Sequence, residues 1–391
     1  MGDAVKTART PPPPFQFDQT EVPGPKPWTH DNFRNNPDNF QFAVIGDRGG
    51  GANPQGTYER AMEQLNWLQP EFVMSVGDYV EGYTSKPEVM NSQWDEFDEI
   101  VAKLQMPFFY VRGNHDINTP ITREAWTELR GPDYYHFIYK DVLFIALDTE
   151  GAEESVAPEL EADLSEYNDL NINDPAAAKT FTAEVDLMSR VQEIVAQEPP
   201  RIEFPEVQIE WFKKVLAENK DVRWTFVFLH QPVWDNPSDG FKEIDAAIQG
   251  RDYTFFAGHT HYYDYDLING MEYITLASAV ATFVHDGPGN VDMLSWVTMT
   301  DDGPEIANLA LKGIFDRKGL DPDMFGAYDR APGLGGAHRG HAGLPERRPG
   351  HGSAGGNQEV GCNNSGCLAE CNIAKGVVNA SHVMSGSLDS R

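Results

Sequence analysis

The sequence predicts an α/β fold, because short apolar runs typical of buried strands alternate with segments that carry apolar residues at helical spacing. The strand-like runs are 41–47, 72–78, 108–112, 142–148, 224–230 and 254–257. Apolar residues three to four positions apart indicate helices over 58–68, 94–104, 124–129 and 207–218. Thr57, Ser92 and Thr122 are predicted to be helix N-caps, since a hydroxyl at that position accepts a hydrogen bond from a free backbone N–H.

The pattern changes after Gly258. Strand-like runs at 273–278, 294–300 and 306–314 follow one another without a helix between them, and turn residues lie at 269–270 and 301–303. This order is typical of antiparallel strands joined by short turns. We therefore expect a second, antiparallel part packed on the first.

The chain is strongly acidic. Its 391 residues include 30 Lys and Arg against 61 Asp and Glu, which gives a formal net charge of −31. Such a surface repels the nucleic-acid backbone and anionic lipid, so we expect neither as a partner. The acidity also suits simple solubility.

No apolar run reaches the roughly 18–20 residues that span a bilayer, and the N-terminus lacks an apolar signal-peptide core. As written, the sequence predicts a cytoplasmic protein. A start further upstream would make a periplasmic or secreted protein possible.

Composition divides the chain into segments. Residues 1–38 are rich in Pro and Asn and are expected to be an extended leader, and residues 39–320 form the predicted domain. An acidic insertion at 150–206 interrupts the alternation, either as a lid over the site or as a solvated excursion. The Gly-rich tail at 321–391 is expected to be disordered, and it holds all three cysteines, so the domain has no disulfide and no thiolate-ligated metal.

Five short motifs follow strand-like runs and carry the chemistry. They are GDRGG at 46–50, GDYVEG at 77–82, GNHD at 113–116, LHQP at 229–232 and GHTH at 258–261. Oxygen and imidazole ligands without a thiolate suit two divalent or trivalent ions of Fe, Mn or Zn. Two adjacent metals clamp the attacking and leaving oxygens of a phosphate ester. The candidate metal ligands are Asp47, Asp78, Asn114, His230, His259 and His261.

Three further residues are candidates for catalysis. His115 follows a predicted ligand and is left free to donate a proton, and Asp116 is expected to hold it in the right tautomer. Arg48 follows Asp47 directly. Its guanidinium either holds two phosphate oxygens or forms a surface ion pair.

In these motifs the chain resembles the calcineurin-like metallophosphoesterases, a family that includes the purple acid phosphatases. The resemblance runs from about 42 to 261, more loosely to 314, and all five motifs occur in the family's order. It implies a four-layer α/β/β/α sandwich with two central mixed β-sheets and metals at the strand ends. It also implies hydrolysis of a phosphate mono- or diester by a metal-bound hydroxide, with His115 as proton donor to the leaving group.

The resemblance further implies how the ligands are divided. Asp78 bridges both metals, Asp47 and His261 belong to the first site, and Asn114, His230 and His259 complete the second.

One motif departs from the family pattern. Much of the family has Asp-x-His in the first motif, whereas Gly49 stands here in place of the imidazole. Purple acid phosphatases also have Asp-x-Gly, but they supply a Tyr three residues after the second-motif Asp, where this chain has Glu81. Glu81, Tyr79 or water remain candidates for the fourth ligand of the first metal. The departure keeps an alternative open: a binding or scaffold protein of the same fold, with one tight metal and little or no turnover.

Overall fold

The computed structural model describes residues 36–49, 56–151, 201–279 and 289–314, with a few single residues between 163 and 186 and residue 317. The predicted leader, insertion and tail lie largely or wholly outside the described residues, so their boundaries stay predictions. Within the described part of the chain, no helix has both the length and the apolar character needed to cross a membrane.

Two β-sheets form the centre of the molecule. The first has the strand order β11-β10-β1-β2-β3, and the second has the order β4-β5-β6-β7-β9-β8. The first comprises β1 (Phe40–Ile45), β2 (Phe72–Ser75), β3 (Phe108–Phe109), β10 (Met293–Thr300) and β11 (Gly303–Ala310). The second comprises β4 (Tyr135–Tyr139), β5 (Val142–Ala146), β6 (Trp224–Phe228), β7 (Tyr253–Ala257), β8 (Asp264–Ile268) and β9 (Met271–Thr275). Both sheets are mixed, since each holds parallel and antiparallel pairs.

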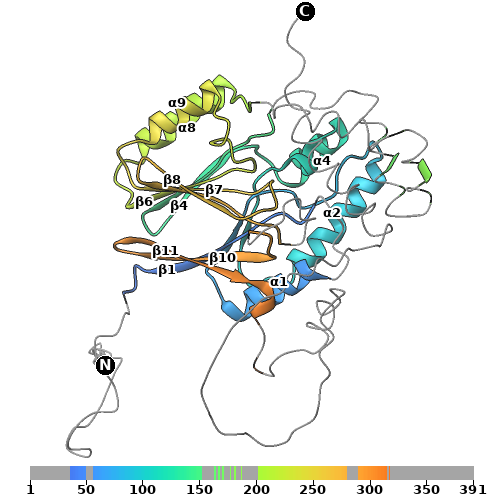
Figure 1. The fold of residues 1–391 in the computed structure, drawn as a ribbon, viewed down its shortest axis with the longest axis horizontal. Helices are drawn as coiled ribbons and strands as arrows, with labels where there is room; N and C mark the ends of the chain where they lie inside the picture. The colour runs from blue at the N-terminus through green and yellow to red at the C-terminus, as the bar shows by residue number, and fades with distance from the viewer. Residues whose placement is uncertain are drawn as a thin grey trace, which may run out of the picture.

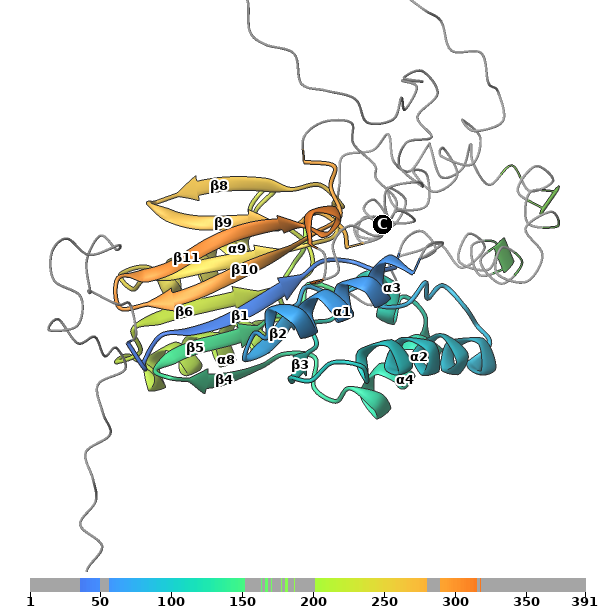
Figure 2. The same cartoon turned by 90° about the horizontal axis from the view of Figure 1, so that it is seen from below.

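Helices cover the outer face of each sheet (Figures 1 and 2). The first sheet packs against α1 (Thr57–Leu68), α2 (Pro87–Val101) and α4 (Pro120–Leu129), and the second against α8 (Glu206–Glu218) and α9 (Asp239–Ile248). A single-turn helix, α3 (Asn114–Ile117), lies after β3, and a short 3-10 turn, η1 (Leu311–Gly313), follows β11. The layers therefore run helix, sheet, sheet, helix, which confirms the predicted α/β/β/α sandwich.

The space between the sheets is filled mainly by phenylalanines. Phe42 of β1 stacks on Phe72 of β2 with ring centroids 5.3 Å apart, and it meets Phe226 of β6 edge to face at 5.0 Å. Such aromatic pairs contribute about 0.5–1.5 kcal/mol beyond their buried area. Because both faces of these strands are covered, β5 and β7 are buried at every position, and Thr254 is the one residue of the two strands with an aliphatic hydroxyl.

The last strands do pair antiparallel as predicted, but they do not form a second part of the molecule. After Gly258 the chain completes both sheets: β10 pairs antiparallel with β1, and β9 pairs parallel with β7. The antiparallel neighbours in sequence, β8–β9 and β10–β11, extend existing sheet edges.

The three predicted N-caps are also displaced. The helices begin after Gly56, Lys86 and Thr119. Prolines at the first helical position of α2 and α4 set those starts, since Pro fixes a helical φ and needs no N–H partner there.

Candidate metal centre

The five motifs meet at one edge of the sandwich. They follow β1, β2, β3, β6 and β7, and these strands run parallel within each sheet. In Figure 2 the arrowhead of β1 points to the side where α3 lies. Side chains at the carboxyl ends of parallel strands share one edge, which is where open α/β sheets bind ligands.

The imidazole of His230 lies at the centre of one group of side chains. Its Nδ1 lies 2.8 Å from the carbonyl oxygen of Val76, which can only accept, so Nδ1 donates and, in the neutral ring, Nε2 carries a lone pair. Nε2 faces Oδ1 of Asn114 at 2.9 Å, Nδ1 of His259 at 3.0 Å and Oδ2 of Asp78 at 3.3 Å. Nδ2 of Asn114 is turned toward the Tyr83 hydroxyl at 3.3 Å, which leaves Oδ1 facing inward.

A second group shares Asp78 with the first. Ligand atoms of Asp47, Asp78 and His261 lie within 4.8 Å of one another, as do those of Asp78, His230 and His259. All of these residues are buried. Oδ1 of Asp47 accepts the N–H of His259 at 3.0 Å, while its Oδ2 is buried with no hydrogen-bond partner among the described residues. Because an unpaired buried carboxylate oxygen is costly, this atom fits a bound cation.

The electrostatics of the centre favour positive charge. Burial raises the pKa of Asp47, despite the opposing effect of His230 and His261. Burial alone would lower the pKa of His230, but the carboxylates of Asp78 and Asp47 raise it to about 10. Burial alone would raise the pKa of Asp78, but the His230 and His115 side chains lower it to about 2. Because Asp47 and Asp78 are buried, their negative charges require a compensating cation, either a proton or a metal ion.

Three of the six candidate ligands have a left-handed backbone. Asp78, His259 and His261 have φ values of 58°, 70° and 54°. Non-glycine residues in this region cost about 1–3 kcal/mol each and gather at functional sites. The tight turns aim each side chain back toward the centre.

Glycines of one motif make room for the carboxylates of another. A Cβ added at Gly113 would lie 2.2 Å from Oδ1 of Asp78, and one added at Gly258 would lie 2.6 Å from Oδ2 of Asp47. Any side chain at these two positions would displace a candidate ligand.

Gly49 is likewise required by its surroundings. A Cβ at this position would lie 2.2 Å from the carbonyl oxygen of Val80. The backbone N–H groups of Arg48 and Gly49 both donate to the carbonyl oxygen of Asp78, at 2.8 and 2.7 Å, and hold the first motif against the second. An imidazole therefore has no room at position 49 in this backbone.

Tyr79 is not placed to supply the fourth ligand. Its hydroxyl donates to the carbonyl oxygen of Val111 at 2.8 Å, accepts the N–H of the same residue at 2.7 Å and also bonds Ser75. The ring packs on the helix side of the first sheet, 4.9 Å from the ring of Phe97. Glu81 is half-buried beside His115 and stays a candidate.

The structure changes the predicted partner of His115. Its Nδ1 donates to the backbone carbonyl of Glu81 at 2.7 Å, and its backbone N–H donates to Oδ1 of Asp78 at 2.9 Å. Asp116 instead accepts three backbone N–H groups, from Asp78 at 3.0 Å, Tyr79 at 2.9 Å and Gly113 at 2.9 Å. These bonds replace the predicted pairing of Asp116 with His115: the carboxylate ties the second motif to the third.

Arg48 forms the ion pair that the sequence left open, although the pair is partly buried. Its guanidinium donates to Glu96 of α2 at 2.6 Å and to the carbonyl oxygen of Tyr79 at 3.0 Å. The side chain of Arg48 is 8% exposed. These two bonds turn the guanidinium toward α2, so the phosphate-holding interpretation finds no support in this geometry.

A polar network beside the centre was not predicted from the sequence. Nε2 of Gln231 donates to both oxygens of Glu150 at 2.8 and 2.9 Å, and the backbone N–H of Gln231 donates to the Thr149 hydroxyl at 3.2 Å. These bonds join the end of β5 to the residue that follows His230. The sequence carries only a weak signal for this network, because Thr149 and Glu150 are polar residues after an apolar strand and belong to no recognised motif.

A family model described as calcineurin-like phosphoesterase matches residues 40–263. A dimetal phosphatase from Danio rerio is similar in structure, with 16% identity, a TM-score of 0.47 and alignment over 70% of this chain and 99% of that one. The GAP50 anchor of the Plasmodium inner membrane complex has 15% identity and a TM-score of 0.42, over 71% of this chain and 86% of that one.

A purple acid phosphatase from yellow lupin (Lupinus luteus) seeds has 13% identity and a TM-score of 0.48, over 71% of this chain. This chain spans 52% of that protein's length. No curated protein matches the sequence.

Proposed function

We propose that this chain, which belongs to the calcineurin-like phosphoesterase family, hydrolyses a phosphate mono- or diester at a two-metal centre. One observation carries the proposal. Nε2 of His230, which bears a lone pair in the neutral ring, faces three further ligand atoms at 2.9–3.3 Å. Such a cluster is stable when a cation lies among the lone pairs.

The residues present fit a pair of metal ions. Asp78 would contact both ions, Asn114, His230 and His259 would complete one site, and Asp47 and His261 would belong to the other. The unpaired Oδ2 of Asp47 and the mixed oxygen and imidazole donors suit Fe, Mn or Zn. When bound, such a pair supplies Lewis-acid stabilisation of the attacking and leaving oxygens of the ester.

His115 is the proposed proton donor to the leaving group. Because its Nδ1 donates to the Glu81 carbonyl at 2.7 Å, Nε2 is the ring atom left to carry a transferable proton. The bond from its backbone N–H to Asp78 holds the residue beside the centre. General acid catalysis of this kind contributes about 10²–10⁴-fold in rate.

Asp116 and Arg48 are proposed as positioning residues. Asp116 fixes the backbone that carries Asp78 and Asn114 through three N–H bonds. Arg48 joins the first motif to α2 through Glu96. Neither is expected to touch the substrate.

The test combines metal analysis with hydrolysis of nitrophenyl phosphate mono- and diesters after loading with Mn, Fe or Zn separately. We expect at least one tight metal per chain and metal-dependent turnover. Asp78→Asn should lose both, whereas His115→Ala should keep the metals and turn over about 10²–10⁴-fold more slowly. Asp95→Asn, which changes an exposed carboxylate on α2, is the control. Less than one tight metal together with no metal-restored activity would refute the proposal.

Gly49 favours a second candidate function, a metal-binding scaffold without turnover. Because the Val80 carbonyl leaves no room for an imidazole at this position, the first site has one fewer ligand than much of the family supplies. A scaffold would bind one tight metal and hydrolyse neither nitrophenyl ester with any of the three metals. The net charge of −31 makes nucleic acid the least favourable substrate for either function.

A further inference from the structure

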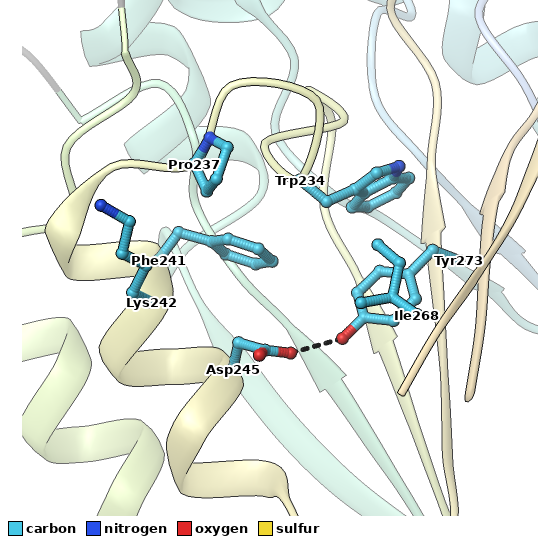
Figure 3. A pocket seen from close by; sticks show the side chains of 7 residues that line it. All are labelled: Trp234, Pro237, Phe241, Lys242, Asp245, Ile268 and Tyr273. Carbon is cyan, nitrogen blue, oxygen red and sulfur yellow. Dashed lines mark hydrogen bonds between the residues drawn. The ribbon is translucent and has the colours of Figure 1, made fainter. Parts of the chain in front are cut away.

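A small cavity opens on the outer face of the second sheet, between α9 and the β8–β9 hairpin (Figure 3). Its volume is about 160 Å³. That is close to the roughly 150 Å³ of a protein cavity known to hold a benzene molecule. The cavity therefore has room for a group of about six heavy atoms.

Three aromatic side chains form most of its wall. Phe241 comes from α9, Trp234 from the loop after β6, and Tyr273 from β9. The rings of Trp234 and Tyr273 lie 5.3 Å apart and are inclined at 68°. In Figure 3 Phe241 stands on the helix side and the other two on the sheet side, with the cavity between them. A group seated there meets aromatic surface from two sides.

One carboxylate lines the cavity and others lie near its aromatic wall. Asp245 of α9 lines the cavity and accepts a hydrogen bond from the Tyr273 hydroxyl at 2.5 Å. Asp266 of β8 lies directly opposite Tyr273 in the strand register, so the two share a face of the sheet. Burial and the nearby carboxylates of Asp266 and Asp264 raise the pKa of Asp235 to about 6. Asp264 and Asp266 thus lie close enough to Asp235, the neighbour of Trp234 in the chain, to act on its charge.

The one basic residue among those that line the cavity is already paired. The ammonium group of Lys242 lies 2.7 Å from Oδ1 of Asp239, one turn earlier on α9. In Figure 3 its charged end lies on the far side of Phe241 from Asp245. The charge that remains facing the cavity is therefore negative.

We propose that this cavity binds a small organic cation, an alkylammonium group about the size of a trimethylammonium head. Each aromatic face attracts a desolvated cation through the negative charge above its ring, and the nearby carboxylates add to this attraction. A neutral group of the same shape would gain only the apolar contact, and an anion would be repelled. The proposal is independent of the phosphoesterase function, since it concerns a different set of residues.

The test compares choline with 3,3-dimethylbutan-1-ol, which has the same shape without the charge, by calorimetric titration of the full chain. We expect choline to bind about 10-fold more tightly, the equivalent of a single strong cation–aromatic contact. Equal affinities, or no heat from either probe at tens of millimolar, would overturn the proposal.

Two variants locate the binding. Asp245→Asn keeps an acceptor for the Tyr273 hydroxyl but removes the charge, and Phe241→Leu keeps apolar bulk but removes an aromatic face. Each should weaken choline about 5–10-fold and change the neutral alcohol little. Asp95→Asn on α2 removes an exposed charge outside the cavity and should leave choline binding unchanged. If Asp245→Asn and Asp95→Asn affect choline equally, the attraction is a property of the whole acidic surface and the site is refuted.

Urea unfolding of each variant reports folding without relying on choline or on a bound metal. Choline contains no phosphate ester, so its failure to bind would leave the proposed hydrolysis untouched.

Discussion

Nε2 of His230 lies 2.9 Å from Oδ1 of Asn114, and in the neutral ring, whose proton lies on Nδ1 toward Val76, both atoms present lone pairs to each other. Two lone pairs at this distance in a buried site repel unless a cation joins them. Burial opposes protonation of His230, yet nearby carboxylates raise its pKa to about 10. The backbone of five separate motifs is thus arranged around a position for positive charge.

Metal removal should therefore lower the stability of the folded chain. A ligand that binds only the native state at about 100 times its Kd stabilises it by about 2.7 kcal/mol. We expect a strong chelator to lower the Tm of the metal-loaded chain measured by calorimetry, and added metal to restore it. Asp78→Asn, which removes the residue shared by both ligand groups, should show little or no response to the chelator. An equal response from both proteins would contradict a structural metal at this centre.

The position of Gly49 predicts that the missing imidazole cannot be put back. A Cβ there would lie 2.2 Å from the Val80 carbonyl oxygen, which is backbone and has little freedom to move. Overpacking of this kind costs about 1–3 kcal/mol, so Gly49→Ala should lower the free energy of unfolding by that amount. Gly313→Ala is the matched control, since a Cβ at Gly313 meets nothing within 4 Å.

Gly49→His should lose stability in the same way and bind no additional metal. Unfolding in urea and metal stoichiometry measure the two effects. A Gly49→His chain that gains a tight metal at wild-type stability would show that the loop can rearrange, against this prediction.

The sequence predicted a residue's location best where that location is set by the strand the residue follows. His230 and Asp47 come directly after buried strands, so their location at one edge followed from the alternation of strands and helices. The structure brings all six candidate ligands to that edge, and the α/β fold is confirmed. Their roles as ligands stay predictions.

Sequence reasoning failed where a contact depends on a turn or on a distant element. The ring of His115 bonds the backbone of Glu81, which lies next to Gly82, and the chain at Gly82 passes so close to His115 that an added Cβ would lie 1.8 Å from the His115 carbonyl oxygen. The partner of Arg48 is Glu96, 48 residues away on α2. The last strands were predicted to form a second antiparallel part. The local pattern gives the order of strands along the chain, but it does not show which existing sheet edge each strand will join.

Because Asp116 accepts three backbone N–H groups, we expect its substitution to lower stability whether or not His115 is present. In Asp116→Asn an amide nitrogen replaces one oxygen, so at least one of the three backbone N–H groups loses its acceptor. A buried donor left unpaired costs about 1–3 kcal/mol. We expect the free energy of unfolding to fall by this amount and metal affinity to weaken, since Asp78 and Asn114 lie on the loosened backbone.

A double-mutant cycle with His115→Ala separates this role from the predicted one. If Asp116 acted by orienting His115, its substitution would have no further effect on turnover once His115 is absent. Our assignment instead expects the stability loss and the weakened metal binding to persist in the double variant. Asp95→Asn on the surface of α2 is again the control.

Asp148 gives a prediction for the dependence of stability on pH. Asp148 lies two residues after β5, and its side chain lies 3.5 Å from Nε of Arg112, which also pairs with Asp133. Burial raises the pKa of Asp148 from 3.8 to about 6, and Arg112 only partly opposes the shift. The folded chain therefore holds this proton more tightly than the unfolded chain. The resulting stability is fully present below the unfolded pKa and is lost as pH rises through about 6.

A shift of about two units corresponds to roughly 3 kcal/mol. The free energy of unfolding of Asp148→Asn, relative to wild type, should therefore increase by about this amount between pH 4 and pH 7.5. Urea unfolding at a series of pH values measures it. Asp148→Ala should show the same increase from a different starting offset, because the change with pH depends on the lost proton site and the offset depends on the new side chain. A difference that stays constant or shrinks with rising pH would mean that Asp148 is ionised in the folded chain as readily as in the unfolded one, and that Arg112 offsets its burial in full.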